Sequence, residues 1–381
     1  MITVHYEGKP IYDIYIEGNY SRLQEAFSTL GSIEKKKVCI VSETNVAPLY
    51  LDMVKQEAEK CFAAVTDFVF PAGEANKNLD IVQNLYEHLI LHHFERGDML
   101  IALGGGVTGD LTGYAAATYL RGISFIQMPT TLLSQVDSSI GGKTGVDFKC
   151  YKNMVGAFHQ PSLVYINLDT LKTLTDKQFC EGMGEIIKHG LIKDYGYYKW
   201  LSANMKQIIE RNTEVCREMI TVSCNIKRMV VEEDPKEQGV RALLNFGHTL
   251  GHAVEKVCDF QLLHGECVAL GCVAASWISW QRGMINEEQY EHICRTFIDA
   301  HLPVCVNRTM EDSNESGSSV FCRIDENEVM EAIKHDKKME AGKVKFVLLK
   351  QPGEAIIDRS VNSQEMKAAL KIILSGGKNE S

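Results

Sequence analysis

The sequence predicts an α/β N-terminal domain with a mostly parallel sheet, followed by a mainly α-helical C-terminal domain. In the first half, short apolar and β-branched runs alternate with helical periodicity, which is typical of stacked strand–helix–strand units. From about residue 180 long helical segments follow without comparable strand signals. Because the chain has 381 residues, 45% of them hydrophobic, it can bury two cores. We expect one domain over residues 1–178 and a second over 179–381.

Individual elements follow from these patterns. Residues 2–17 are expected to form an antiparallel pair of strands, and the rest of the first domain to contain strands at 37–42, 65–70, 98–103 and 123–128 with helices at 47–61 and 76–93. In the second domain we expect helices at 198–212, 214–233, 246–258, 265–282 and 285–299, a late strand pair near 343–349 and 354–359, and a final helix. Residues 307–322 are rich in Ser, Asn and Glu and predict a mobile surface loop, and the tail at 375–381 predicts disorder.

Composition excludes several classes of protein. The formal net charge of −10 argues against nucleic-acid and anionic-membrane partners, which require a broad basic surface. No apolar stretch reaches the length of about 18 residues needed for a membrane span, and the N-terminus lacks a signal-peptide pattern. The 12 cysteines include no Cys-x-x-Cys pair and lie in apolar surroundings, which favours buried free thiols. We therefore expect a soluble cytoplasmic protein.

A glycine-rich turn, Gly-Gly-Gly-Val-Thr-Gly-Asp at 104–110, directly follows the strand expected at 98–103. Glycines allow the backbone to approach a phosphate, and the amides at a helix start favour negative charge. The turn contains Gly-x-Gly-x-x-Gly but lies far into the chain and lacks the usual acidic residue about 20 positions later, so a plain tight turn is the alternative. A second turn at 71–77 offers Glu74 and Lys77 to a ribose or phosphate, although a solvated helix N-cap explains the same residues.

Three separate local patterns supply potential metal ligands: Glu185, His248 and His264. Two imidazoles and one carboxylate form the ligand set of an open catalytic zinc, which keeps a fourth position for a substrate oxygen. His248 and His252 are four residues apart, so on a helix both rings project from one face and both can reach one ion. A packed or solvated helix face is the alternative for this pair, and an ordinary ion pair is the alternative for Glu185 with Lys188.

The stretch 137–153 places Lys143 in a glycine-flanked turn, with Lys152 and Asn153 shortly after it. Backbone amides and an ammonium group in such a turn suit the oxygens of a phosphate. A solvated loop is the alternative interpretation.

Four motifs, at 104–110, 129–146, 152–153 and 245–252, together resemble the 3-dehydroquinate synthase family of sugar phosphate cyclases. The resemblance runs from about residue 37 to 350. It implies a dehydroquinate synthase-like fold, with a nucleotide-binding α/β domain and a helical metal-binding domain, related to the iron-dependent polyol dehydrogenases.

The resemblance also implies an activity. Members are carbon–oxygen lyases of the shikimate pathway that convert 3-deoxy-D-arabino-heptulosonate 7-phosphate to 3-dehydroquinate and phosphate, using bound NAD⁺ that is recycled in each turnover and a divalent metal, zinc or cobalt. The partner is thus a small anionic sugar phosphate, and the family pattern implies a homodimer. In family terms Glu185, His248 and His264 bind the metal, whereas His252 lies beside the substrate as a hydrogen-bonding neighbour.

Two further sets of residues carry over position by position. The dinucleotide contacts implied by the resemblance are Glu43, Asn45, Glu74, Lys77, Gly105, Gly106, Val107, Asp110, Thr130, Thr131, Leu133, Asp137, Ser138, Lys152 and Thr173. The substrate residues are Asp137, Lys143, Asn153, Lys188, Lys227, Arg241, Asn245, His252 and Lys337, joined by Arg121, which reaches across a dimer interface in the family. Glu43 departs from members that carry Asp at its position.

Two alternative activities stay open. A cyclase similar to 2-deoxy-scyllo-inosose synthase has no substrate carboxylate to bind, and Arg241 with Asn245 argues against it. An NAD-dependent polyol or glycerol phosphate dehydrogenase releases NADH, and the expected cluster of phosphate-binding lysines argues against a simple polyol substrate.

Overall fold

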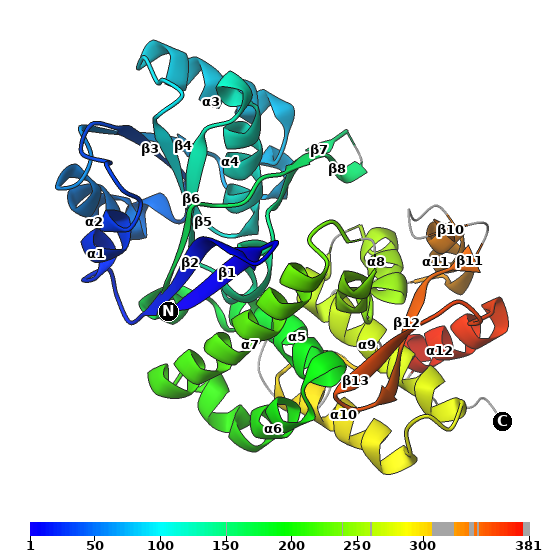
Figure 1. Cartoon of the computed structure of the whole chain (residues 1–381). Helices are drawn as coiled ribbons and strands as arrows, with labels where there is room; N and C mark the ends of the chain where they lie inside the picture. The colour runs from blue at the N-terminus through cyan, green and yellow to red at the C-terminus, as the bar shows by residue number, and fades with distance from the viewer. Residues whose placement is uncertain are drawn as a thin grey trace. The chain divides into compact units, whose positions relative to one another are not determined.

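The computed structural model describes residues 1–381 except for residues 150, 238, 260, 307–323, 335–338, 341–342 and 376–381. Its contacts divide the chain into two compact units, one formed by Met1–Thr175 and Cys216–Pro235, the other by Asp176–Val215 and Lys236–Ser381 (Figure 1). The loop predicted at 307–322 lies outside the described residues, as does the tail from residue 376.

The first unit is built on a seven-stranded sheet in the order β1-β2-β9-β6-β5-β3-β4. Only β1 and β2 pair antiparallel, and the other neighbours are parallel, which confirms the predicted sheet. The strands are β1 (Ile2–Tyr6), β2 (Lys9–Glu17), β3 (Lys37–Glu43), β4 (Ala64–Phe70), β5 (Met99–Gly104), β6 (Ser124–Pro129) and β9 (Leu163–Asn167). A hairpin of β7 (Lys143–Phe148) and β8 (Tyr151–Phe158) lies apart from this sheet.

Helices cover both faces of the sheet (Figure 1). The helices α1 (Leu23–Ser28) and α2 (Ala47–Glu59) pack with Ile40 and Ile101 in one core, whereas α3 (Leu79–Leu91) and α4 (Gly106–Thr118) pack with Val41 and Leu100 in the other. Because β3 and β5 are adjacent and the helices after them lie on opposite faces, a topological switch point lies at the carboxyl ends of these strands. Ligands of open α/β sheets bind at such a point.

The second unit is mainly helical, as predicted. Its helices are α5 (Asp176–Lys193), α6 (Tyr195–Ile209), α8 (His248–Val257), α9 (His264–Gln281), α10 (Glu287–Asp299), α11 (Glu326–Lys334) and α12 (Ser363–Ser375), with the hairpins β10 (Met339–Glu340)/β11 (Lys343–Val344) and β12 (Phe346–Gln351)/β13 (Glu354–Asp358). The helix α9 packs against α5, α8, α10, α12 and β12. Being apolar on all sides, α9 forms the centre of this unit. The long helix α7 (Thr213–Glu233) groups largely with the first unit.

Glycines bring α5, α8 and α9 unusually close together. A Cβ atom on Gly271 of α9 would overlap the carbonyl oxygen of Gly247, and one on Gly265 would overlap the carbonyl oxygen of Glu181 in α5. A Cβ on Gly247 would lie 2.6 Å from the sulfur of Cys272 in α9. The space beside the histidines of α8 is therefore occupied by α9, and close helix packing requires these glycines.

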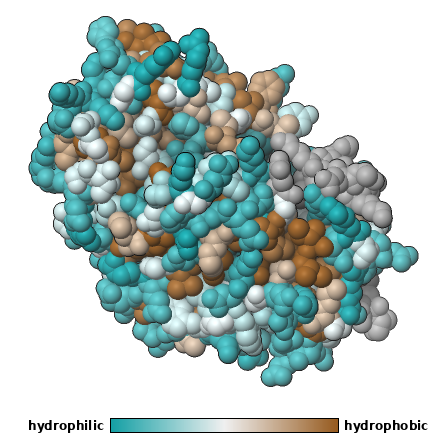
Figure 2. Space-filling view, in the orientation of Figure 1, coloured by the Kyte–Doolittle hydropathy of each residue, from teal (hydrophilic) through white to brown (hydrophobic). Residues whose placement is uncertain are grey.

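Two predictions from composition can be compared with the structure. The ten cysteines described are all free, and eight of them are buried. Among the described segments, no helix combines the length and hydropathy needed to cross a bilayer. The face shown in Figure 2 is largely hydrophilic, with hydrophobic residues in separate patches.

Candidate active site

Glu185, His248 and His264 meet at one point of the second unit. Glu185 lies on α5, His248 is the first residue of α8 and His264 the first of α9. The Nε2 atoms of His248 and His264 lie 3.6 and 3.5 Å from the same carboxylate oxygen, Oε1 of Glu185. Donor atoms bound tetrahedrally at about 2.1 Å from one ion are about 3.4 Å apart. Each of the two imidazole nitrogens therefore lies from the Glu185 oxygen at the spacing expected of two ligands to one zinc-sized ion.

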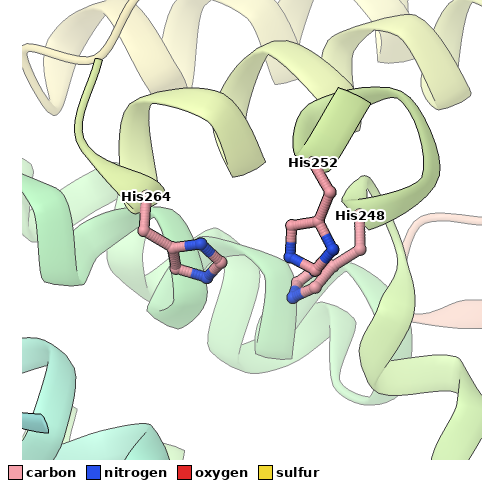
Figure 3. Close-up of side chains that lie close together, drawn as sticks. All are labelled: His248, His252 and His264. Carbon is pink, nitrogen blue, oxygen red and sulfur yellow. The ribbon is translucent and has the colours of Figure 1, made fainter. Parts of the chain in front are cut away.

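The other nitrogen of each imidazole has its own acceptor. Nδ1 of His248 lies 3.2 Å from the carbonyl oxygen of Phe246, and Nδ1 of His264 lies 3.3 Å from Oε2 of Glu255. These acceptors hold a proton on Nδ1 of each ring, so Nε2 is the nitrogen that an ion would bind in place of a proton, as metal coordination requires. Figure 3 shows His248 and His252 on α8 facing His264 at the start of α9.

Electrostatics at this centre favour a cation. Burial alone lowers the pKa of His264, but its hydrogen bonds with Glu185 and Glu255 outweigh burial and raise the pKa to about 10. Burial also raises the pKa of the nearby Glu181 carboxyl. Lys188, one turn beyond Glu185 and 1% exposed, forms an ion pair with it. Several carboxylates thus surround the two imidazoles, and a positive charge between them is stabilised.

His252 lies close to the two other imidazoles. Its ring centroid is 4.7 Å from that of His248 and 5.5 Å from that of His264, and the three residues offer nitrogens that all lie within 4.8 Å of one another. The spacing argument, which placed His248 and His252 on one helix face, is therefore correct about their proximity. That His252 serves the substrate and not the metal stays a prediction.

In the first unit, the glycine-rich turn lies where β5 ends and α4 begins, at the switch point of the sheet. Gly105 is the N-cap of α4 and Gly106 its first residue. A Cβ on Gly105 would lie 3.2 Å from Thr131, and one on Gly106 would lie 3.3 Å from the hydroxyl of Ser138. The structure therefore brings the turn together with two other residues predicted to bind the dinucleotide.

A buried ammonium group joins three predicted residues beside this turn. Nζ of Lys77, a residue 4% exposed, lies 2.7 Å from Oδ2 of Asp110 and 2.7 Å from Oδ1 of Asn153. Burial alone lowers the pKa of Lys77, but Asp110 and Glu74 raise it, so the ammonium stays charged. Asn153 itself has a φ of 53°, a conformation that few non-glycine residues adopt.

Asp137 and Lys227 form a second ion pair in the first unit. Asp137 lies on a single π-helical turn, η3 (Ser134–Ser138), and Lys227 lies on α7 and is 5% exposed. Such turns are frequent at functional sites.

The remaining predicted residues are more dispersed. Oε2 of Glu43 accepts a hydrogen bond from the backbone N–H of Asn45 at 2.7 Å. The hydroxyl groups of Thr173 and Tyr50 are hydrogen-bonded to each other at 2.5 Å. In the second unit, Arg241 is 2% exposed and Asn245 donates to Glu237 at 3.1 Å. The others lie as follows: Val107 on α4, Thr130 and Leu133 after β6, Arg121 after α4, Lys143 on β7 and Lys152 on β8. Lys337 lies outside the described residues.

Two features of the site are not predicted by the sequence motifs. Lys143 begins strand β7 directly after Gly141 and Gly142, both at positive φ, so the predicted turn is the entry to a hairpin. Glu255 lies outside the sequence motifs, although it is seven residues after His248 and therefore on the same face of α8. That spacing was the available signal.

Comparison with known proteins agrees with this architecture. The family described as 3-dehydroquinate synthase N-terminal matches residues 67–181, and the one described as 3-dehydroquinate synthase C-terminal matches residues 182–339. The 3-dehydroquinate synthase of Acetivibrio thermocellus is 40% identical over 362 residues, which is 93% of this chain and 94% of the relative. That of Hydrogenovibrio crunogenus is 41% identical over 353 residues, covering 92% and 93%.

Solved structures show the same fold. A 2-deoxy-scyllo-inosose synthase complexed with carbaglucose-6-phosphate, NAD⁺ and Co²⁺ superimposes with a TM-score of 0.83 at 22% identity, covering 98% of this chain and 100% of the other. The 2-epi-5-epi-valiolone synthase of Streptomyces hygroscopicus, with NAD⁺ and Zn²⁺ bound, gives 0.82 at 25% identity, covering 98% and 99%. The family matches span most of the chain and the curated relatives share its length, so this chain is an enzyme of the 3-dehydroquinate synthase family.

Proposed function

We propose that this enzyme converts 3-deoxy-D-arabino-heptulosonate 7-phosphate to 3-dehydroquinate and phosphate, as a carbon–oxygen lyase of the shikimate pathway. The observation that carries the proposal is the convergence of Glu185, His248 and His264 in a member of this family. The curated relatives named 3-dehydroquinate synthase support the choice of substrate.

The proposed cofactors are NAD⁺ and a divalent metal, zinc or cobalt. The two cyclase structures with NAD⁺ and either Co²⁺ or Zn²⁺ support them, and so do the donor atoms of this chain. We propose that residues 1–178 bind the dinucleotide, with its diphosphate at Gly105 and Gly106, and that residues 179–381 bind the metal and much of the substrate. When bound, NAD⁺ accepts and returns a hydride while the metal ion acts as a Lewis acid on a substrate oxygen.

The substrate is oxidised at a carbinol, loses phosphate by elimination and is reduced again. Its sugar ring then opens, and the enolate so formed adds to the internal ketone in an intramolecular aldol addition, without net redox change. The residues of this chain hold it through these steps. Arg241 binds the substrate carboxylate with its planar guanidinium, and Lys143, Lys188, Lys227 and Lys337 bind the phosphate as compact charges. Asn153, Asn245 and His252 complete the hydrogen bonds to its hydroxyl groups.

We further propose a homodimer in which Arg121 extends toward a second copy. Leu120 and Arg121 have φ values of 51° and 71° and precede Gly122 at 122°. Two consecutive non-glycine residues at positive φ are uncommon, and such backbone strain clusters at functional sites.

The test supplies purified protein with zinc, catalytic NAD⁺ and the heptulosonate phosphate, and follows phosphate release together with absorbance at the NADH wavelength. We expect phosphate in amounts far above the NAD⁺ present and no accumulation of NADH. Stoichiometric NADH would favour a dehydrogenase. Inertness here with turnover of glucose 6-phosphate would favour a cyclase similar to 2-deoxy-scyllo-inosose synthase, whose substrate has no carboxylate for Arg241.

A further inference from the structure

Glu255 lies behind His264, on the side of the ring that faces away from Glu185. It is seven residues beyond His248 on α8, and its side chain is 10% exposed. Its Oε2 atom accepts the hydrogen bond from Nδ1 of His264 at 3.3 Å, while Nε2 of the same ring lies 3.5 Å from Glu185. The two nitrogens of an imidazole point apart, so Glu255 contacts the ligand ring without reaching the ion position.

The two histidine ligands are therefore held differently. His248 donates to the neutral backbone carbonyl of Phe246, whereas His264 donates to a carboxylate. Hydrogen bonds to charged acceptors are the stronger kind, and a carboxylate behind an imidazole makes its other nitrogen a more basic donor. His264 also depends more on its partner for orientation, because its side chain is 29% exposed against 12% for His248.

Charge balance gives Glu255 a second effect. Glu185 forms an ion pair with Lys188, which offsets its negative charge. A divalent cation beside this pair is therefore only partly neutralised by Glu185. The carboxylate of Glu255 supplies additional negative charge on the far side of the His264 ring.

We propose that Glu255 is a positioning residue of the metal centre: it fixes the tautomer and orientation of His264, and its charge strengthens binding of the divalent cation. The inference rests on the proposed metal centre.

Two substitutions separate the hydrogen bond from the charge. Glu255→Gln keeps an acceptor oxygen for Nδ1 and loses the charge, whereas Glu255→Leu loses both. Zinc affinity is measured by competition with a chromophoric chelator, and the ligand field by the visible absorption of the Co²⁺-substituted protein. We expect zinc to bind about tenfold more weakly to Glu255→Gln and about 100-fold more weakly to Glu255→Leu, with an altered cobalt spectrum in the latter.

Glu266→Gln is the matched control. The Glu266 carboxylate accepts from the backbone of Leu263 at 2.7 Å and lies 3.5 Å from Lys177, so it is close to His264 in sequence but is not the acceptor for its ring. We expect its zinc affinity to stay within about threefold of the parent protein, since loss of a carboxylate that does not bond a ligand has no positioning effect. Circular dichroism and thermal melting of the metal-free proteins check that all variants fold.

Three outcomes would overturn the proposal. If Glu255→Leu has the zinc affinity and cobalt spectrum of the parent protein, Glu255 has no role in metal binding, although the metal centre itself stands. If Glu255→Gln and Glu266→Gln lose zinc affinity equally, the effect comes from the overall negative charge near the site and not from the hydrogen bond to His264. A parent protein that binds neither metal would overturn the metal centre itself, and with it the proposed function.

Discussion

The carboxyl edge of the sheet in the first unit and the meeting point of α5, α8 and α9 in the second both gather charged side chains, but they balance charge in opposite ways. At the sheet edge each buried lysine has an aspartate partner, Lys77 with Asp110 and Lys227 with Asp137. In the helical unit the carboxylates of Glu185 and Glu255 converge on the two nitrogens of one imidazole, that of His264. The first arrangement is preformed and nearly neutral, whereas the second favours a cation.

This difference suggests how each unit responds to its ligand. The ammonium groups near the sheet edge already have aspartate partners, which hold them in place before any ligand binds. An anionic dinucleotide or phosphate that binds there therefore meets groups that are already positioned. A metal ion in the helical unit instead offsets repulsion among buried carboxylates, so folding and metal binding are coupled there. Loss of a ligand should therefore be most costly in the second unit.

The largest effect is expected for His248→Ala. Removing one of two imidazole donors leaves too few ligands for a catalytic ion, and Lewis-acid stabilisation is worth several kcal/mol. At about 1.4 kcal/mol for each tenfold, kcat should fall about a thousandfold. Zinc content by atomic absorption should fall in parallel, while NAD⁺ affinity stays unchanged. His92→Ala, which removes an exposed imidazole in the first unit, is the control, and normal zinc content in His248→Ala would contradict the centre.

The second-largest effect is expected for the ion pair between Lys77 and Asp110. Lys77→Met leaves the Asp110 carboxylate, whose side chain is 19% exposed, without its ammonium partner. Breaking a fully buried ion pair costs about 3–5 kcal/mol, and this partly exposed pair should cost less. We expect a lower urea midpoint and weaker NAD⁺ binding, since the unpaired carboxylate then repels the dinucleotide phosphates.

The double variant Lys77→Met/Asp110→Asn removes the uncompensated charge. It should recover most of the stability without recovering NAD⁺ affinity, because the ammonium is still absent. Recovery of NAD⁺ affinity in the double variant would show that Lys77 acts on the fold and not on the cofactor.

A smaller effect is expected for Lys227→Met, which keeps the apolar stem of a buried lysine. Loss of one charge-assisted hydrogen bond to the substrate is worth about 1.5–3 kcal/mol, so kcat/KM should fall about 10- to 100-fold. Zinc content should not change, because Lys227 is not one of the three metal-ligand side chains. Lys206→Met on the exposed side of α6 provides the control, and unaltered kcat/KM would exclude Lys227 from the substrate site.

Much of this organisation was predictable because it is encoded locally. Most strands of the sheet and the helices α2 and α3 follow from periodicity, and Glu185, His248 and His264 from their motifs. The strand β9 was not predicted, because a run of only five residues is too short for local pattern to decide its structure. Contacts between helices are a different matter: Glu255 reaches His264 only because glycines such as Gly271 let α9 approach α8. The seven-residue spacing places Glu255 on the same face of α8 as His248, but no local pattern shows that α9 packs against that face.

The smallest effect is expected at Glu43, the last residue of β3. The Glu43 carboxylate already accepts the backbone N–H of Asn45, so it is engaged at the end of β3 by the chain itself. A hydrogen bond that a partly exposed carboxylate accepts from a ribose hydroxyl contributes little more than one from water would. NAD⁺ affinity of Glu43→Ala should therefore fall less than about threefold by fluorescence titration. A tenfold loss would mean that the first unit, like the second, depends on an individual carboxylate for its ligand.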